Sequence, residues 1–315
     1  MYSYENYARV KEEISARRQR ALDEARVRAE DLRLRSEQVA LIDEQLAKTG
    51  PALFRAACRG EDITPIKEQN LLLQAKKREI IKSLGYPEDY TEVKYTCPIC
   101  SDSGYTEKGA VCSCFREALI KATIASSGMG LLIDKQSFDN FDVSRYEGDC
   151  AEDMRRTFEL AKGYVKNFPK RRGNLILFGK TGTGKTHISS AIAGEIIRMG
   201  YDVVYDSAQN ILNDFENERF GKERSARGES ATEKYLTSDL LIIDDLGTEF
   251  STSFSLSCLY NLLNTRQNRD LSTIISTNLE PTALAAKYED RIYSRIIGRG
   301  TQALFFCGKD YRVTR

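Results

Sequence analysis

The sequence lacks the features that would place it in a membrane, outside the cell or permanently on a nucleic acid. Among its 315 residues, no apolar run approaches the roughly 18 residues of a membrane span. Residues 1–20 are polar and charged, with no apolar signal segment. The 47 lysines and arginines balance 46 aspartates and glutamates, so any nucleic-acid contact must come from local patches. We expect a cytoplasmic protein without membrane contact.

Histidine is nearly absent, with 1 residue against 8 cysteines. Four cysteines are scattered, as ordinary small buried residues would be: Cys58, Cys150, Cys258 and Cys307. Hydrophobic residues make up 41% of the chain and charged residues 30%. This composition allows a normal core in a soluble protein, and the length suits one large domain with a smaller one.

The remaining cysteines form two close pairs, Cys97 with Cys100 and Cys112 with Cys114. Two thiolates from each of two turns can form the tetrahedral sulfur shell that Zn²⁺ favours in structural sites. Such a site would fold a segment too small for its own core, and four cysteines leave no open position for chemistry. An iron–sulfur cluster is the main alternative; a redox pair and two disulfides are the others.

Residues 179–186 carry the pattern of a phosphate-binding loop between a strand and a helix. An apolar run at 175–178 precedes them, and residues 188–197 keep a helical apolar spacing. The glycines let backbone N–H groups point at phosphate oxygens, and the helix N-terminus adds positive charge. We expect Lys185 to reach the β- and γ-phosphates and Thr186 to hold Mg²⁺; a glycine-rich turn that binds nothing is the alternative. The predicted loop residues are Gly179, Lys180, Thr181, Gly182, Thr183, Gly184, Lys185 and Thr186.

Two carboxylates, Asp244 and Asp245, follow the apolar run 240–243. Because strand ends at one edge of a parallel sheet face the same crevice, Asp244 should lie beside the phosphate loop. We expect Asp244 to hold Mg²⁺ through water and Asp245 to orient or deprotonate the attacking water; a plain polar turn is the alternative. Asn278 ends another apolar run and could hydrogen-bond the γ-phosphate or the lytic water, although asparagine after a strand is also common turn chemistry.

Two arginines, Arg291 and Arg295, stand four residues apart on a predicted helix and share one face. A guanidinium can neutralise charge developing at a γ-phosphate, and it can be supplied by a neighbouring subunit. The alternative is salt bridging on a helix surface.

A polar insertion, residues 215–234, contains Arg219, Lys222, Arg224 and Arg227 with two phenylalanines. Basic residues with aromatic neighbours suit contact with a single strand of nucleic acid. The window holds as many acids, so a solvated loop explains it at least as well.

Short apolar runs alternate with helical patterns in the second half of the chain. They lie at 175–178, 203–205, 240–243, 273–276 and 303–306. This alternation predicts an α/β fold with a parallel sheet covered by helices on both faces.

The first 85 residues are rich in Arg, Glu, Ala and Leu. Apolar residues at three-to-four spacing up to Leu46 predict one long amphipathic helix that ends at Gly50-Pro51, with further helices at 53–58 and 65–84. The arm has too little core to stand alone, so it packs either on a partner or on itself. We divide the chain into a helical partner-binding region, a cysteine module, a linker and a P-loop domain, at 1–87, 88–116, 117–136 and 137–315.

Together these motifs resemble the bacterial replicative helicase loaders of the DnaC/DnaI type, which belong to the IstB-like ATP-binding superfamily and the AAA+ ATPases. The resemblance rests on GKTGTGKT, LLIIDDLGTE, STN, RIYSRIIG and FFCGKDYR, with FDNFD before the domain, and it covers residues 137–315 densely. It implies an AAA+ P-loop fold preceded by the helical arm and the zinc knuckle.

The resemblance also implies roles for individual residues: Phe138 and Phe141 line the adenine pocket, Asn278 is sensor 1, Arg295 is the arginine finger with Arg291 beside it, and Arg312 is a sensor-2-like arginine. The arm would bind the hexameric helicase, and a ring or spiral of AAA+ domains would bind single-stranded DNA. ATP, Mg²⁺ and Zn²⁺ are the expected cofactors.

The resemblance predicts an ATPase that loads the replicative helicase onto single-stranded DNA. In strong AAA+ motors the second carboxylate is a glutamate; Asp245 is one methylene shorter, which predicts slow, switch-like hydrolysis. A transposition helper ATPase that shares the catalytic motifs and a non-hydrolysing scaffold are the alternatives.

Overall fold

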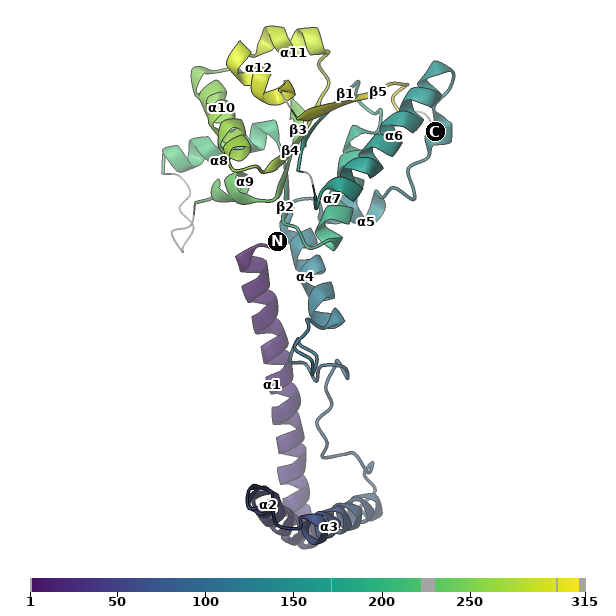
Figure 1. Cartoon of the computed structure of the whole chain (residues 1–315), viewed down its shortest axis with the longest axis vertical. Coiled ribbons are helices and arrows are strands. Elements are labelled where there is room, and N and C mark those ends of the chain that lie inside the picture. The colour runs from purple at the N-terminus through teal and green to yellow at the C-terminus, as the bar shows by residue number, and fades with distance from the viewer. Residues whose placement is uncertain (1, 171, 222–229, 299, 312–315) are drawn as a thin grey trace. The chain divides into compact units, whose positions relative to one another are not determined.

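The structure, a computed structural model, describes residues 2–170, 172–221, 230–298 and 300–311. It divides into two compact units (Figure 1). Unit 1 comprises Met1–Val10 and Arg116–Arg315, and unit 2 comprises Lys11–Phe115. Each unit is described by itself below.

A five-stranded sheet forms the centre of unit 1, and all its neighbouring strands pair in parallel. The strand order is β2-β3-β4-β1-β5. Each predicted apolar run is a strand, which confirms the α/β fold with a parallel sheet. The strands are β1 (Asn174–Gly179), β2 (Val203–Ser207), β3 (Leu240–Leu246), β4 (Ser272–Thr277) and β5 (Thr301–Phe306).

Helices cover both faces of this sheet (Figure 1). Leu175 and Leu177 of β1 point into one apolar layer, whereas Ile176 and Phe178 point into the other. Because both faces are buried, the strands are continuously apolar instead of alternating. The first layer is covered by α5 (Gly130–Lys135), α6 (Asp149–Asn167) and α7 (Lys185–Arg198), with η1 (Val143–Arg145) before α6; the second is covered by α8 (Ala208–Arg219), α9 (Glu233–Thr237), α10 (Ser253–Asn268), α11 (Pro281–Lys287) and α12 (Asp290–Ile297).

The segment 117–136, expected to be a linker, is largely helical. It contains most of α4 (Ser113–Ser126) and all of α5. Met129 and Ile133 are buried in the first apolar layer of unit 1. In α1 (Tyr4–Arg35), the Asn6 amide donates to the Ser126 hydroxyl at 2.7 Å. The end of α4 and the first turns of α1 therefore belong to the body of unit 1.

A fully buried arginine, Arg266, forms hydrogen bonds with several segments at the end of the sheet where the strands begin. Its guanidinium donates to the carbonyls of Tyr235, Ser238 and Ser272, at 2.7, 3.1 and 2.5 Å, and to the Thr273 hydroxyl at 3.0 Å. Burial lowers the pKa of Arg266 to about 9. The hydrogen bonds compensate for removing the charged group from water.

Unit 2 contains the rest of α1, then α2 (Glu37–Cys58) and α3 (Thr64–Ser83). The single long helix predicted to run from the N-terminus to Gly50 was wrong in two places. Ser36 breaks it, and its hydroxyl caps α2 by accepting from the Val39 N–H. Pro51 lies inside α2 instead of ending it. The residue before it is glycine, which has no Cβ to clash with the proline ring.

Within the described residues, no helix is both long and apolar enough to cross a bilayer.

Cys150 and Cys307 form a disulfide that joins the first turn of α6 to the residue after β5. The prediction that both are ordinary small buried residues is wrong. They are 157 residues apart, and only the packing of α6 against the edge strand β5 brings them together. Cys58 is exposed, which also contradicts the expectation of burial.

Reducing the Cys150–Cys307 disulfide should destabilise unit 1. The bond closes a loop of more than a hundred residues, and the chain-entropy model predicts a loss of about 4 to 5 kcal/mol in unfolding free energy. Urea denaturation with and without dithiothreitol measures it. A Cys150→Ser chain should unfold at the same urea concentration under both conditions; a wild-type chain equally indifferent to reductant would contradict the prediction.

Candidate functional site

The predicted phosphate-binding loop connects the end of β1 to the start of α7. Gly182 and Gly184 adopt left-handed backbone angles, with φ of +76° and +98°. A Cβ on Gly184 would lie 2.9 Å from both the Phe141 ring and the Tyr146 hydroxyl. Only glycine fits this position, and the loop leads directly into the N-terminus of α7, where an anion is favoured.

The Lys185 side chain extends back across the loop to its first residues. Its ammonium donates to the carbonyls of Gly179 and Lys180, at 2.6 and 2.9 Å, and to the Asn278 side-chain oxygen at 2.6 Å. The last contact joins two residues 93 positions apart. It exists because β4, which ends next to Asn278, pairs directly with β1.

Asp244 is buried at the end of β3 and accepts hydrogen bonds from three hydroxyls. Tyr205 and Thr186 donate to its Oδ2, at 2.5 and 3.4 Å, and Ser276 donates to its Oδ1. The contact with Thr186 brings together the two residues predicted to hold Mg²⁺. Hydroxyl donors orient the carboxylate without neutralising its charge, which suits a hard cation.

Asp245 occupies a left-handed conformation with φ of +53°. The register between β3 and β4 shifts at this point, between Ile243 and Leu246. The Asp245 N–H donates to the Ser276 hydroxyl at 3.0 Å, and the Asn278 amide donates to the Asp245 carboxylate at 3.5 Å. The irregularity turns the second carboxylate toward Asn278, and strained backbone of this kind is often found at functional sites.

These residues surround a pocket of about 240 Å³ at the carboxyl ends of the strands. The lining combines an ammonium, a carboxylate, a side-chain amide, hydroxyls and the loop backbone, which are the groups that bind a magnesium–triphosphate. The residues present therefore fit the nucleotide. The pocket is lined by Gln136, Thr181, Gly182, Gly184, Lys185, Thr186, His187, Asp245, Asn278 and Tyr311.

The aromatic residues before the P-loop domain lie beside this loop. The Phe141 ring stacks on Phe158, with centroids 5.6 Å apart, and contacts the edge of His187 at 5.0 Å. The Phe138 ring meets the Phe158 ring edge to face, with centroids 5.6 Å apart. The structure thus brings Phe141 against Gly184, and Phe138 joins this group through the Phe158 ring.

The chain after β5 returns to the phosphate-binding loop. The Tyr311 N–H donates to the Gly182 carbonyl at 3.2 Å, and its hydroxyl donates to the Arg145 carbonyl at 2.9 Å. Arg312, predicted to be a sensor-2-like residue, lies outside the described residues.

The two arginines of α12 do not line the pocket. Arg295 donates to the Gln267 side chain at 2.9 Å, and Arg291 pairs with Glu289 at 2.7 Å and lies over the Tyr260 ring. Gln267 is at the end of α10, close to where β4 begins. A six-residue strand spans about 20 Å, so Arg295 and the phosphate-binding loop lie at opposite ends of the sheet.

Only part of the basic insertion can be placed. Arg219 ends α8 and lies over the rings of Phe254 and Phe220, 4.9 and 5.8 Å from their centroids. Phe220 is 61% exposed. Lys222, Arg224 and Arg227 lie outside the described residues.

The four clustered cysteines converge in unit 2, with their sulfurs all within 4.8 Å of one another. The Sγ atoms of Cys97 and Cys112 are 3.8 Å apart, and those of Cys100 and Cys114 are 3.5 Å apart. Tetrahedral zinc with Zn–S bonds of about 2.3 Å holds its sulfurs about 3.8 Å apart. The cluster therefore fits a single metal ion and is too tight for a multi-iron core between the thiolates.

The pKa values of two of the cysteines shift in opposite directions: burial and the neighbouring thiols raise the pKa of Cys114. Although burial alone would raise the pKa of Cys100, the Gly104 N–H and the neighbouring thiols lower it to about 7. Asp102, fully buried, accepts from the N–H groups of Thr96 and Cys97 and pairs with Arg17 of α1 at 2.7 Å. This carboxylate fixes the first cysteine turn and attaches it to the helical arm.

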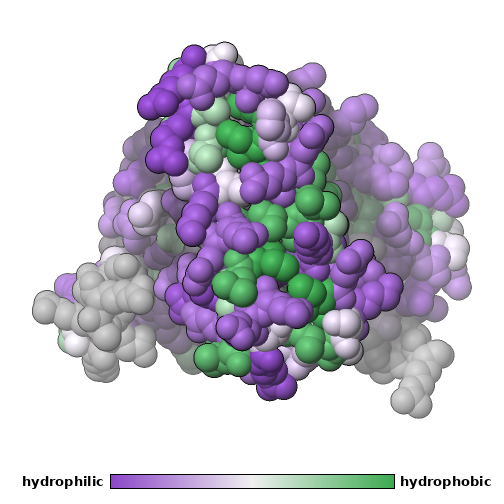
Figure 2. Space-filling view, turned by 90° about the horizontal axis from the view of Figure 1, so that it is seen from below, coloured by the Kyte–Doolittle hydropathy of each residue, from purple (hydrophilic) through white to green (hydrophobic). Residues whose placement is uncertain are grey.

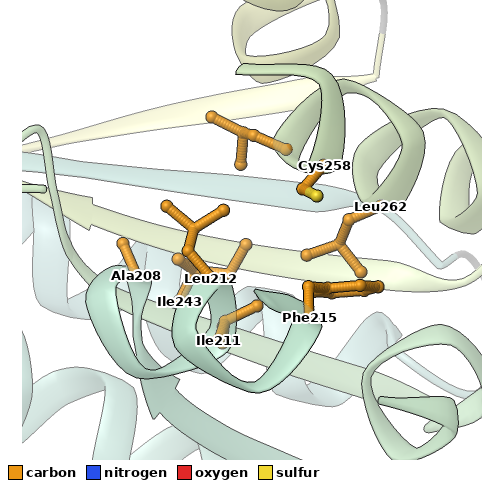
Figure 3. A pocket seen from close by; sticks show the side chains of 8 residues that line it. Ala208, Ile211, Leu212, Phe215, Ile243, Cys258 and Leu262 are labelled. Carbon is orange, nitrogen blue, oxygen red and sulfur yellow. The ribbon is translucent and has the colours of Figure 1, made fainter. Parts of the chain in front are cut away.

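A second cavity lies between α8 and α10 beneath β3 and has a different character (Figure 3). The side chains that point into it in Figure 3, including Phe215, Ile243 and Cys258, are apolar, and its volume is about 10 Å³. A space of this size and polarity stays dry. It is a packing gap in the core and cannot hold a nucleotide.

Sequence reasoning missed several residues of the nucleotide site, namely Tyr205, Ser276, Tyr146, His187 and Tyr311. Tyr146 donates to the Thr183 carbonyl at 2.9 Å, and His187 contacts the Ser137 carbonyl and Asn140. Burial lowers the pKa of His187. Ser276 carried a detectable signal, because it is a polar residue in a buried strand beside Asn278. The others depend on strand order and on loops folding back.

Comparison with known proteins agrees with this geometry. Residues 127–297 match the family described as IstB-like ATP binding protein. The chain is 24% identical over 210 residues to the replicative helicase loader DnaC of Escherichia coli K12, covering 63% of this chain and 80% of that protein. It is 27% identical over 214 residues to the phage-like element PBSX protein XkdC of Bacillus subtilis 168, covering 61% and 75%.

A crystal structure of the DnaC helicase loader also resembles the chain, with 20% identity and a TM-score of 0.47, covering 56% of this chain and 98% of that one. The family match spans more than half of the sequence and contains the phosphate-binding loop, both aspartates and Asn278. The chain belongs to the IstB-like ATP-binding protein family.

Proposed function

We propose that the chain is an ATP-dependent loader of the replicative DNA helicase onto single-stranded DNA, working as a nucleotide switch with slow hydrolysis. The observation that carries the proposal is the convergence of Lys185, Thr186, Asp245 and Asn278 on one pocket. Buried Asp244 accepts a hydrogen bond from Thr186 at the edge of this pocket. They lie at the start of α7, at the end of β3 and directly after β4, in a chain that belongs to an ATP-binding family.

Each residue of the pocket has a distinct chemical task. Lys185 holds the β- and γ-phosphates, and Thr186 with Asp244 holds the magnesium, which supplies charge neutralisation when bound. Asp245 orients the attacking water, and Asn278, in contact with both Lys185 and Asp245, senses the γ-phosphate. Because the Asp245 side chain is one methylene shorter than the glutamate of strong AAA+ motors, the proposal includes slow turnover.

The position of Arg295 supports an active site shared between two copies of the chain. Its guanidinium lies at the end of the sheet away from its own phosphate-binding loop. An arginine so placed can act only on the nucleotide of a neighbouring copy. Head-to-tail contacts of this kind generate rings or open spirals, and Arg291, one turn earlier, would support the interface.

The helical arm has the surface expected of a partner-binding element. Leu41, Phe54, Leu71 and Leu72 of α2 and α3 are each more than half exposed. Apolar side chains gather over this helix pair (Figure 2). Two helices cannot bury their apolar sides without a third layer, and exposed apolar patches mark protein interfaces. We assign this surface to the helicase.

The cysteine cluster and the α8 end complete the proposal. A structural zinc ion at the four cysteines would fold the turn region that precedes α4, which has few apolar residues of its own.

Arg219 with the exposed Phe220 ring supports single-stranded DNA as a ligand, because bases stack on aromatic rings and phosphates pair with guanidinium.

Co-purification with the replicative helicase of the same host, with and without ATP, tests the proposal. The wild-type chain should retain the helicase, and Leu72→Glu should weaken capture at least tenfold, because the interface would bury an unpaired carboxylate. Leu131→Glu is the matched control: Leu131 is 79% exposed but lies in α5 of unit 1. It should leave capture unchanged.

Two results would contradict the proposed loader function. Retention of a transposase in place of the helicase would favour the transposition helper. A chain that binds ATP and the helicase but shows no hydrolysis above background, with or without single-stranded DNA, would favour the scaffold.

A further inference from the structure

We propose that Tyr205 is a positioning residue for the magnesium of this site, and that its hydroxyl holds the Asp244 carboxylate in the orientation that the metal needs. The inference rests on the proposed nucleotide site but goes beyond it. Tyr205 lies on β2, outside the phosphate-binding loop and outside the strand that carries the carboxylates.

The contact between Tyr205 and Asp244 is short and specific. The phenol donates to Asp244 Oδ2 at 2.5 Å, within the range of charge-assisted O–H···O⁻ bonds. Ser276 donates to the other oxygen, and Thr186 approaches Oδ2 at 3.4 Å. A carboxylate accepts about four hydrogen bonds, so within the described residues about one direction remains for a metal-bound water.

The register of the sheet explains why tyrosine serves at this position. Tyr205 lies opposite Ile242, two residues before Asp244 along the neighbouring strand. A shorter hydroxyl residue would not span that offset, whereas the long tyrosine side chain brings its hydroxyl to Asp244. A phenol is protonated at neutral pH, so the Tyr205 hydroxyl can donate to the carboxylate.

The backbone of Tyr205 is itself held firmly. Its N–H donates to the Ser127 carbonyl at 2.8 Å. Gly128, with φ of +82°, packs so closely that a Cβ there would lie 2.6 Å from the Tyr205 carbonyl oxygen. The residues after α4 therefore fix this part of β2. A rigidly supported donor behind a metal-binding carboxylate is the arrangement that tunes metal affinity.

The test is a magnesium titration of full-length Tyr205→Phe. This change removes one oxygen and keeps the ring, so the core packing is preserved. With a fluorescent ATP analogue as probe, the Mg²⁺ concentration for half-maximal binding should rise about tenfold, as in other losses of an outer-shell hydrogen bond. Nucleotide affinity in excess EDTA and the melting temperature of unit 1 should stay close to wild type.

Tyr235→Phe is the matched control. Its hydroxyl also donates to carboxylates, those of Asp206 and Asp214, at 2.9 and 2.6 Å. It should leave the magnesium curve unchanged. Superimposable curves for Tyr205→Phe and wild type, or equal shifts in both variants, would overturn the proposal. Failure of wild type to bind nucleotide at any magnesium concentration would instead overturn the proposed function.

Discussion

Mixing two inactive variants of the chain should restore ATP hydrolysis. Lys185→Ala removes the ammonium that contacts the loop carbonyls and Asn278, so this chain should not bind ATP productively. Arg295→Ala keeps the pocket but removes the guanidinium at the other end of the sheet. Loss of an arginine finger lowers turnover by about 10³- to 10⁵-fold, so neither chain should hydrolyse ATP measurably.

In the mixture, an intact pocket can face an intact finger. Random association at equal concentrations should produce this arrangement at about a quarter of head-to-tail interfaces. Steady-state phosphate release, measured for each chain and for the mixture, is the readout. Activity of the mixture no greater than the sum of the separate chains would rule out a shared site.

A matched control comes from the same end of the sheet. Arg269 is exposed near the end of α10 and donates to the Leu236 carbonyl at 3.2 Å. Arg269→Ala should leave hydrolysis close to wild type. An equal loss in Arg269→Ala would show that any charge removed from this surface weakens assembly, and that Arg295 has no specific role.

Removing the metal from the cysteine cluster should unfold the turns around it. Zinc binding contributes about 10 to 16 kcal/mol in small zinc modules, and the segment 96–115 has little other core. Cys112 is almost fully buried among the other thiols. Cys112→Ser should therefore lose the metal and expose this segment to protease, while the sheet of unit 1 remains folded.

Elemental analysis and limited proteolysis check this prediction together. Wild type should contain about one zinc per chain, and Cys58→Ser, which changes an exposed free cysteine, should match it. Iron with acid-labile sulfide would show a cluster instead of zinc. Equal protease resistance of wild type and Cys112→Ser would contradict a structural role for the metal.

The predictions that the structure confirmed rest on patterns among residues that are adjacent in the sequence. The apolar run 240–243 is a buried strand, and Asp244 and Asp245 lie at its end beside the loop. The helical spacing after Lys185 is α7. Patterns of this kind are reliable because each strand or helix must bury its apolar residues, and the sequence spacing of those residues differs between strands and helices.

The predicted bounds of the first helices failed because tertiary packing overrode local sequence rules. Gly50-Pro51 is a common helix end, but α2 continues through it because α2 packs along α3. Ser36 is one serine among many polar residues, and only the cap that it makes distinguishes it as a helix start. Competing local signals of similar strength are decided by packing.

The sequence by itself determined the chemistry available to this protein: a phosphate-binding loop, paired carboxylates at the end of a strand, and four thiolates in two turns. Contiguous residues are enough for such motifs. Only the tertiary structure placed Tyr205 against Asp244, joined Cys150 to Cys307 and set Arg295 at the end of the sheet away from its own loop. Strand order and register decide those contacts, because they bring together residues that nothing along the chain relates.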